Sequence, residues 1–120
     1  MSTPEGIILA QILAYLKMRR VYAWRNNTGA VKLEGRSGSR FVRYGMKGSS
    51  DILGILDDGR FLAIEVKAPT GRATPEQSCF LGEIRARGGV AFIARSAEEV
   101  ERQLYHPSAW ILQKCKEIEA

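Results

Sequence analysis

The stretch DILGILDDGRFLAIEVK, residues 51–67, decides the fold because it contains two apolar runs around a turn signal. Residues 52–56 and 60–67 are rich in large apolar side chains, and Asp57-Asp58-Gly59 between them is a typical turn sequence. This pattern predicts a β-hairpin. Glu65 and Lys67 interrupt a second strand that otherwise has the composition of a buried strand. These two charges therefore need a chemical explanation.

The length of the turn sets which residues face each other across the hairpin. A three-residue loop with Gly59 in the left-handed conformation places Asp51 opposite Glu65. A two-residue turn would place Asp51 opposite Val66 instead, because the pairing slips by one position. In the three-residue register, two carboxylates stand roughly 5 Å apart on one face of the sheet. Lys67 projects from the same face, since side chains alternate along a strand.

Helix and strand signals on both sides of this hairpin complete an α/β pattern. Thr3-Pro4-Glu5 and Thr74-Pro75-Glu76 both have the form of a helix start. The strand predicted at 90–94 is wholly apolar and follows a helix, so it should lie parallel to 61–67. The sequence predicts one domain over residues 1–120, with a small mixed central sheet flanked by helices and an α-β-β-β-α-β core. The other predicted elements are a strand at 21–26 and helices beginning at Ser96 and Pro107.

Basic residues concentrate between Lys17 and Lys47. That segment has nine basic residues and one acid, so it carries +8, whereas the whole chain carries +5. Aromatic side chains lie among these cations. Five glycines, four in this segment and Gly48 directly after it, indicate mobile loops with a short strand at Phe41–Tyr44. The pattern is typical of a surface that binds a polyphosphate backbone, although a solvated basic face has the same composition. The residues expected to contact DNA are Arg25, Lys32, Arg36, Arg40, Arg43 and Lys47. Asn26, next to Arg25, either reaches a phosphate or is a solvated strand end.

The composition excludes several classes of protein. His106 is the single histidine, which excludes His-metal nucleases and Ser/His/Asp hydrolases. Cys79 and Cys115 have no metal-ligand spacing, so we interpret them as reduced thiols. The apolar stretch Ile7–Leu16 is too short for a membrane span, and signal-peptide features are absent. We expect a protein of the prokaryotic or viral-host cytoplasm with no membrane partner.

The grouped charges indicate a particular chemistry. Two adjacent carboxylates suit a hard divalent ion such as Mg²⁺ or Mn²⁺. Lys67 would add a positive donor that steers an attacking water or stabilises charge on a phosphate. Together these groups are suited to phosphodiester hydrolysis. The alternative is a structural ion pair between Glu65 and Lys67 or Asp51, without any chemistry.

These residues resemble a known nuclease motif. Asp51 followed by Glu65-Val66-Lys67 and Gln77 is similar to the PD-(D/E)XK nuclease superfamily. With Glu5 and Gly48-Ser49-Ser50-Asp51, the chain resembles more closely the VRR-NUC domain (virus-type replication-repair nuclease) in its stand-alone form. The resemblance extends from Glu5 to Ala94 and implies a restriction-endonuclease-like fold. It departs at Ser50, where the family has a proline.

The resemblance implies roles for the matching residues. Asp51, Glu65 and the main-chain carbonyl of Val66 would hold Mg²⁺ or Mn²⁺, and Lys67 would position or activate the nucleophilic water. Gln77 and Glu5 would belong to the same site. Structural alternatives exist for both, since Glu5 suits a helix N-terminus and Gln77 completes a capping box with Thr74.

The expected function is that of a metal-dependent endonuclease that hydrolyses DNA phosphodiester bonds. The resemblance to stand-alone domains of this type implies a homodimer. Two active sites related by a two-fold axis in turn imply branched DNA, such as a Holliday junction, as the substrate. The exposed sheet edge and a C-terminal helix with Trp110, Ile111 and Leu112 are possible dimer contacts, although that helix equally suits the domain's own core. The main alternative is a nucleic-acid-binding module of the same fold that does not cut. Two others are a sequence-specific restriction-type nuclease and a structural ion-pair protein.

Overall fold

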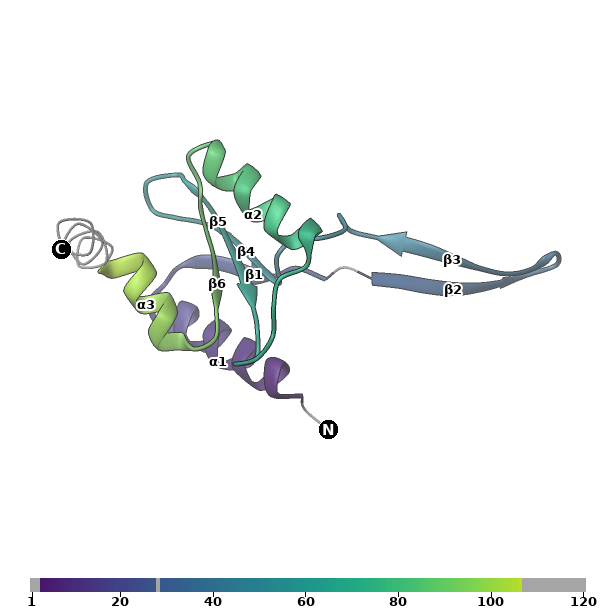
Figure 1. Cartoon of the computed structure of the whole chain (residues 1–120), viewed down its shortest axis with the longest axis horizontal. Coiled ribbons are helices and arrows are strands. Elements are labelled where there is room, and N and C mark those ends of the chain that lie inside the picture. The colour runs from purple at the N-terminus through teal and green to yellow at the C-terminus, as the bar shows by residue number, and fades with distance from the viewer. Residues whose placement is uncertain (1–2, 28, 107–120) are drawn as a thin grey trace.

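The protein has an α/β fold with an arm that projects from its body (Figure 1). The computed structural model describes residues 3–27 and 29–106. Four strands form a mixed sheet in the order β1-β4-β5-β6, and β2 and β3 form a separate two-stranded sheet. Without that second sheet, the element order is the predicted α-β-β-β-α-β core. The elements are α1 (Pro4–Met18), β1 (Tyr22–Arg25), β2 (Gly29–Gly35), β3 (Gly38–Tyr44), β4 (Ile52–Ile55), β5 (Phe61–Val66), α2 (Pro75–Ala86), β6 (Val90–Ala94) and α3 (Ala97–Tyr105).

Helices cover the two faces of the four-stranded sheet. Ile12 and Leu16 of α1 and Val100 of α3 pack on one face, against a core that includes Ile64. Leu81 of α2 packs on the other face in a second cluster. The central strand β5 is therefore buried on both sides over 62–66, which explains its nearly continuous apolar sequence.

The hairpin of β4 and β5 has the predicted register. Ile52 pairs with Ile64 and Ile55 with Phe61, and the turn residue Gly59 has φ +89°. These pairs confirm the three-residue loop. Extended by one step, the same register brings Asp51 opposite Glu65.

The other local signals also produced the predicted elements. Thr3 and Thr74 cap α1 and α2 with their side-chain oxygens. Strand β6 pairs with β5 in parallel, as expected for strands joined through a helix. Strand β1 lies over 22–25, within the predicted range, and forms one edge of the sheet.

The glycine-rich basic segment is not the set of mobile loops that the sequence predicts. Residues 29–35 and 38–44 form two paired strands, with Gly35 opposite Gly38 across a two-residue turn. The predicted short strand at Phe41–Tyr44 is confirmed as part of β3. The prediction of loops elsewhere in the segment was wrong, because the glycines stand at strand ends and after β3, and apolar and charged residues alternate over 31–34 of β2.

Part of the prediction falls outside the described residues. The C-terminal helix expected from Pro107, with Trp110, Ile111 and Leu112, belongs to residues 107–120. Within residues 3–27 and 29–106, the helices are too short or too polar to cross a membrane.

Candidate active site

Asp51 and Glu65 meet at the end of the sheet where β5 ends. Asp51 directly precedes β4, and its Oδ2 accepts a hydrogen bond of 2.9 Å from the main-chain N–H of Val66. This side chain thereby continues the β4–β5 pairing beyond the last pair of main-chain residues. Glu65 projects from β5 and is only 1% exposed. The two predicted carboxylates are thus brought to one place, and Asp51 is held by the backbone next to Glu65.

Lys67 and Gln77 both approach the Glu65 carboxylate. Lys67 Nζ lies 3.8 Å from Glu65 Oε1, and Gln77 Nε2 donates a hydrogen bond of 3.1 Å to the same oxygen. Gln77 also completes a capping box, because its Oε1 accepts from the N–H of Thr74 at 2.9 Å. The amide of Gln77 therefore serves both purposes: its oxygen caps α2, and its nitrogen orients Glu65.

The environment of Glu65 strongly disfavours a negative charge. Burial, together with the hydrogen bond and the negative charge of the neighbouring Asp51, raises the pKa of Glu65 to about 8, although the positive charge of Lys67 opposes the shift. Without another cation, Glu65 holds a proton at neutral pH. A site with such a perturbed carboxyl group is a candidate for chemistry rather than for stability alone.

The donor set fits a hard divalent cation that remains open to substrate. Glu65 Oε2 is buried and receives no hydrogen bond from the described residues, and a buried oxygen without a partner is unfavourable. Within the described part of the chain, no three His, Cys, Asp or Glu side chains gather to hold a metal. Mg²⁺ commonly uses one or two carboxylates and completes its shell with water and substrate phosphate. Asp51 and Glu65 match that pattern, whereas a closed structural metal site would need more side chains.

Glu5, the further acid expected in this site, is close enough to influence the charge of Glu65. It is half-buried in the first turn of α1, and its charge is one of the smaller causes that raise the pKa of Glu65. It therefore acts on the site through its field. The same position also places a negative charge at the N-terminus of α1, which stabilises the helix.

The loop that carries Asp51 is fixed by Asn26, a role that the sequence analysis missed. The main-chain N–H of Asn26 donates to the carbonyl of Asp51 at 2.7 Å. Its side-chain Nδ2 donates to Ser49 Oγ at 2.7 Å and to the carbonyl of Ser50 at 3.0 Å. Asn26 is thus a half-buried clamp at the end of β1. No local sequence signal could reveal this, because its partners are more than twenty residues away.

Gly48 and Ser50 complete this loop. Gly48 has φ +83°, and a Cβ atom there would lie 2.7 Å from the main chain of Glu76 at the start of α2. Only glycine allows this loop to approach the helix that carries Gln77. Ser50 is fully buried, and its hydroxyl has no hydrogen-bond partner among the described residues. Position 50, where the family has a proline, is therefore enclosed by the surrounding protein.

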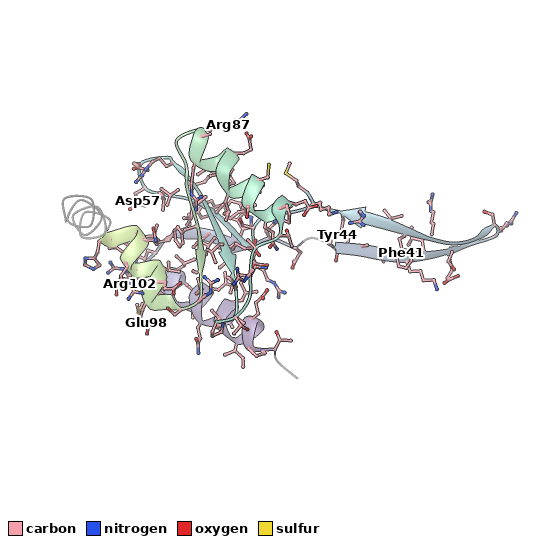
Figure 2. All side chains as sticks on the ribbon, in the orientation of Figure 1. Phe41, Tyr44, Asp57, Arg87, Glu98 and Arg102 are labelled. Atoms are coloured by element: carbon pink, nitrogen blue, oxygen red, sulfur yellow. The ribbon has the colours of Figure 1, made fainter. Side chains whose placement is uncertain are left out.

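The cations expected to bind DNA lie mainly on the β2–β3 hairpin (Figure 2). Lys32 pairs with Phe41 and Ala30 with Arg43, so both cations project from the same face of the hairpin. Lys32 lies 3.8 Å from Glu34, and Lys47 lies 3.7 Å from Glu76. Such exposed pairs contribute little to stability. Of the other two expected DNA-contact residues, Arg25 is the last residue of β1 and Lys47 lies in the loop that leads to Asp51.

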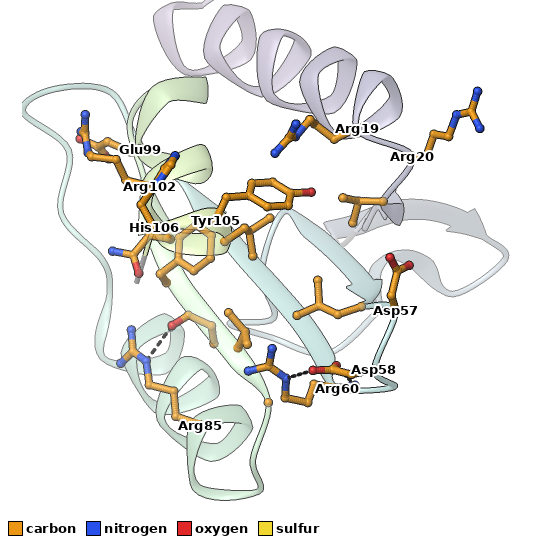
Figure 3. Close-up of a pocket in the computed structure, with 18 residues that line it drawn as sticks. Arg19, Arg20, Asp57, Asp58, Arg60, Arg85, Glu99, Arg102, Tyr105 and His106 are labelled. Carbon is orange, nitrogen blue, oxygen red and sulfur yellow. Dashed lines mark hydrogen bonds and ion pairs between the residues drawn. The ribbon is translucent and has the colours of Figure 1, made fainter. Parts of the chain in front are cut away.

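A cavity elsewhere in the molecule is separate from this site (Figure 3). Its volume is about 950 Å³, and it is lined by the β4–β5 turn and by the ends of α1, α2 and α3. Two of its arginines are already engaged: Arg85 donates to the carbonyl of Ala91 and Arg60 to Asp58, both at 2.7 Å. None of Asp51, Glu65, Lys67 and Gln77 lines it, so we do not assign the chemistry to this cavity.

Comparison with known proteins gives one match. The family model described as "VRR-NUC domain" matches residues 3–98. No curated protein and no solved structure matches the chain. The matched span includes α1, the whole four-stranded sheet and every residue of the acidic site described above. The chain therefore belongs to the VRR-NUC domain family, which makes its function that of a nuclease acting on nucleic acid.

Proposed function

We propose that this chain is a Mg²⁺- or Mn²⁺-dependent endonuclease that cuts branched DNA, such as a Holliday junction, as a homodimer. The observation that carries the proposal is the convergence of Asp51, Glu65, Lys67 and Gln77 at one end of the sheet. The proposal takes residues 1–120 as one nuclease domain and places its work in the cytoplasm of a prokaryote or a viral host.

Asp51 and Glu65, with the main-chain carbonyl of Val66, would hold the divalent ion. When bound, the ion would supply a Lewis acid for the phosphate and make a water molecule more acidic. The chain's own contribution is geometric: the N–H of Val66 orients Asp51, and Gln77 orients Glu65. Both carboxylates are therefore positioned before substrate arrives, which lowers the entropic part of the barrier.

Lys67 would act on the reacting phosphate. It is 8% exposed, and its ammonium nitrogen lies 3.8 Å from Glu65 Oε1. A positive donor in such a dry site stabilises the added negative charge of the transition state more strongly than the same group does in water. Lys67 would also help to position the attacking water.

The β2–β3 hairpin supports the binding of a long polyanion. Four of the six expected DNA-contact residues lie on it, and the hairpin extends well beyond the body of the protein (Figure 1). Contacts of lysine and arginine with phosphates fix position and carry no base sequence. Selection by DNA shape is therefore the expected mode, and two sites related by a two-fold axis suit a four-way junction.

The test is cleavage of labelled four-way junction, flap and linear duplex, with Mg²⁺ or Mn²⁺ against EDTA. The wild type should make paired, symmetric cuts in the junction, and EDTA should abolish them. Lys67→Ala and Asp51→Ala should each bind the junction but cut it at least about 10³-fold more slowly. Binding without cutting under any metal would overturn the enzyme and leave a nucleic-acid-binding module of the same fold.

A further inference from the structure

Two apolar surfaces of this chain are exposed although neither belongs to the acidic site. The first, the sheet patch, lies on the face of the sheet that α2 covers over β5 and β6. The pairs Tyr22–Ile55 and Ile55–Phe61 place three of its side chains side by side across β1, β4 and β5. The sheet patch consists of the exposed Tyr22, Trp24, Ile55 and Phe61 and, at its margin, the half-buried Leu53, which also packs against the core under α2. Tyr22 is 72% exposed, and its ring packs edge-on against Trp24 at 5.6 Å.

The second surface, the arm face, lies on the β2–β3 hairpin. Val31 pairs directly with Val42, and alternation along each strand places Leu33 and Tyr44 on the same face. The arm face consists of Val31, Leu33, Val42 and Tyr44, which are each between 39% and 47% exposed. Arg40, opposite Leu33, is the only charged residue that the register places on this face. The opposite face of the same hairpin, the cationic face, carries Lys32, Arg43 and Glu34 and also Phe41, which is 73% exposed.

A hairpin of this kind needs a covering surface. An isolated two-stranded hairpin is marginal in water, and among the strands of residues 3–27 and 29–106, β2 and β3 pair only with each other. The molecule measures 65 × 31 × 29 Å, and the arm accounts for its long axis by pointing away from the body (Figure 1). The arm face therefore cannot reach the sheet patch of its own chain.

We propose that the protein forms a two-fold homodimer by arm exchange, in which the arm face of each copy covers the sheet patch of the other. The occupant is a second copy because the two surfaces match: both are apolar, and each chain carries one of each. The opposite face of the hairpin, with two of the expected DNA contacts, Lys32 and Arg43, would stay open to DNA. This inference rests on the homodimer of the proposed function and names its contact surface.

The two surfaces are comparable in length. Seven residues of strand extend for roughly 24 Å, enough to lie across three strands spaced roughly 5 Å apart. The two surfaces together offer nine apolar side chains per copy, four of them aromatic. These four are 38–72% exposed, so a dimer contact would bury the part of each ring that now faces water.

Arm exchange also has a consequence for the active site. Leu53 of the sheet patch is two residues from Asp51 on the same strand face, so the patch adjoins the acidic pair. An arm that covers the patch turns its cationic face, with Lys32 and Arg43, outward. Each acidic site would then be flanked by cations from the other copy.

The experiment measures the mass of the full chain by analytical ultracentrifugation, without metal or DNA, so that it is independent of nuclease activity. The wild type should be a dimer. Leu33→Glu on the arm face and Tyr22→Glu on the sheet patch should each weaken dimerisation at least about tenfold. Phe41→Glu is the matched control: Phe41 is 73% exposed on the same hairpin but on its cationic face, so this variant should remain a dimer. Circular dichroism checks folding, and Leu33→Ser and Tyr22→Ser repeat the test with milder changes.

Mixing the two variants separates arm exchange from a contact between two arms. In a mixed dimer of Leu33→Glu and Tyr22→Glu, one contact carries both defects and the other is fully intact. The mixture should therefore dimerise more strongly than either variant alone. A mixture no stronger than its components would overturn arm exchange. A monomeric wild type, or a Leu33→Glu variant that stays dimeric and loses DNA binding instead, would overturn the dimer surface and assign the arm face to nucleic acid.

Discussion

Lys67 and Lys32 are the same kind of side chain in opposite settings. Lys67 is nearly buried at the end of β5, beside a carboxylate that is also oriented by an amide. Lys32 stands on an exposed arm, with a single ion pair to Glu34. Burying a charge is costly unless its partners are fixed, so the first setting gives one rigid geometry. The second gives long-range attraction for an anion and little stability.

The largest expected effect is that of Glu65→Gln, which changes the carboxylate beside the buried Lys67. Cleavage should fall at least about 10³-fold, because the amide cannot hold the ion as a carboxylate does. Without metal, the variant should nevertheless melt at a higher temperature than the wild type at pH 8, because no buried charge has to form. Metal-dependent cleavage and thermal unfolding are the two measurements. A variant that loses both activity and stability would mean that the carboxylate is structural.

Gly48→Ala tests the loop that connects the exposed arm to the acidic site. The positive φ and the close main chain of Glu76 should make this change destabilising by about 2–3 kcal/mol. Cleavage should fall as well, since the loop carries Asp51. Gly82→Ala is the control: it lies in α2 with open space around it, and it should stabilise by about 0.5–1 kcal/mol. Urea unfolding measures both, and equal effects of the two changes would contradict the close approach.

The pH dependence of stability tests the raised pKa of Glu65. In the unfolded chain the group titrates near 4.5, and in the folded protein near 8. Between these values the folded state holds a proton that the unfolded state has released, so metal-free stability should fall as pH rises. The slope should approach at most about 1.4 kcal/mol per pH unit. Mn²⁺ should stabilise more at pH 8 than at pH 6, because the ion competes with this proton. The same pH profile in Glu65→Gln would contradict the assignment.

The smallest expected effects are those of substitutions on the exposed β2–β3 arm. Lys32→Ala and Arg43→Ala should each weaken binding to any duplex by a few-fold and reduce the salt dependence of log Kd by about 0.9 per lost phosphate contact. Stability should be unchanged. Titration of fluorescent duplex at several salt concentrations measures this. Arg87→Ala, on the exposed end of α2, is the matched control and should bind as the wild type does.

Local patterns in the sequence determined the secondary structure of the body and the identity of the acidic pair. The Asp57-Asp58-Gly59 turn fixes the hairpin register within a few residues, and each Thr-Pro-Glu segment caps its own helix. Because the register follows from the turn, the approach of Asp51 to Glu65 was predictable without the tertiary structure. The family motif lies on these same elements, so the matched family could also be recognised from residues 5–94.

Tertiary structure decided everything that depends on contacts across longer stretches of chain. The clamp of Asn26 on the Asp51 loop joins residues more than twenty positions apart. The raised pKa of Glu65 needs α2 packed over the sheet, since burial is its main cause. The two exposed apolar surfaces appear only when β1, β4 and β5 are placed side by side and the hairpin is seen to extend from the body. Sequence patterns describe neighbours along the chain, whereas burial, desolvation and surface shape arise from neighbours in space.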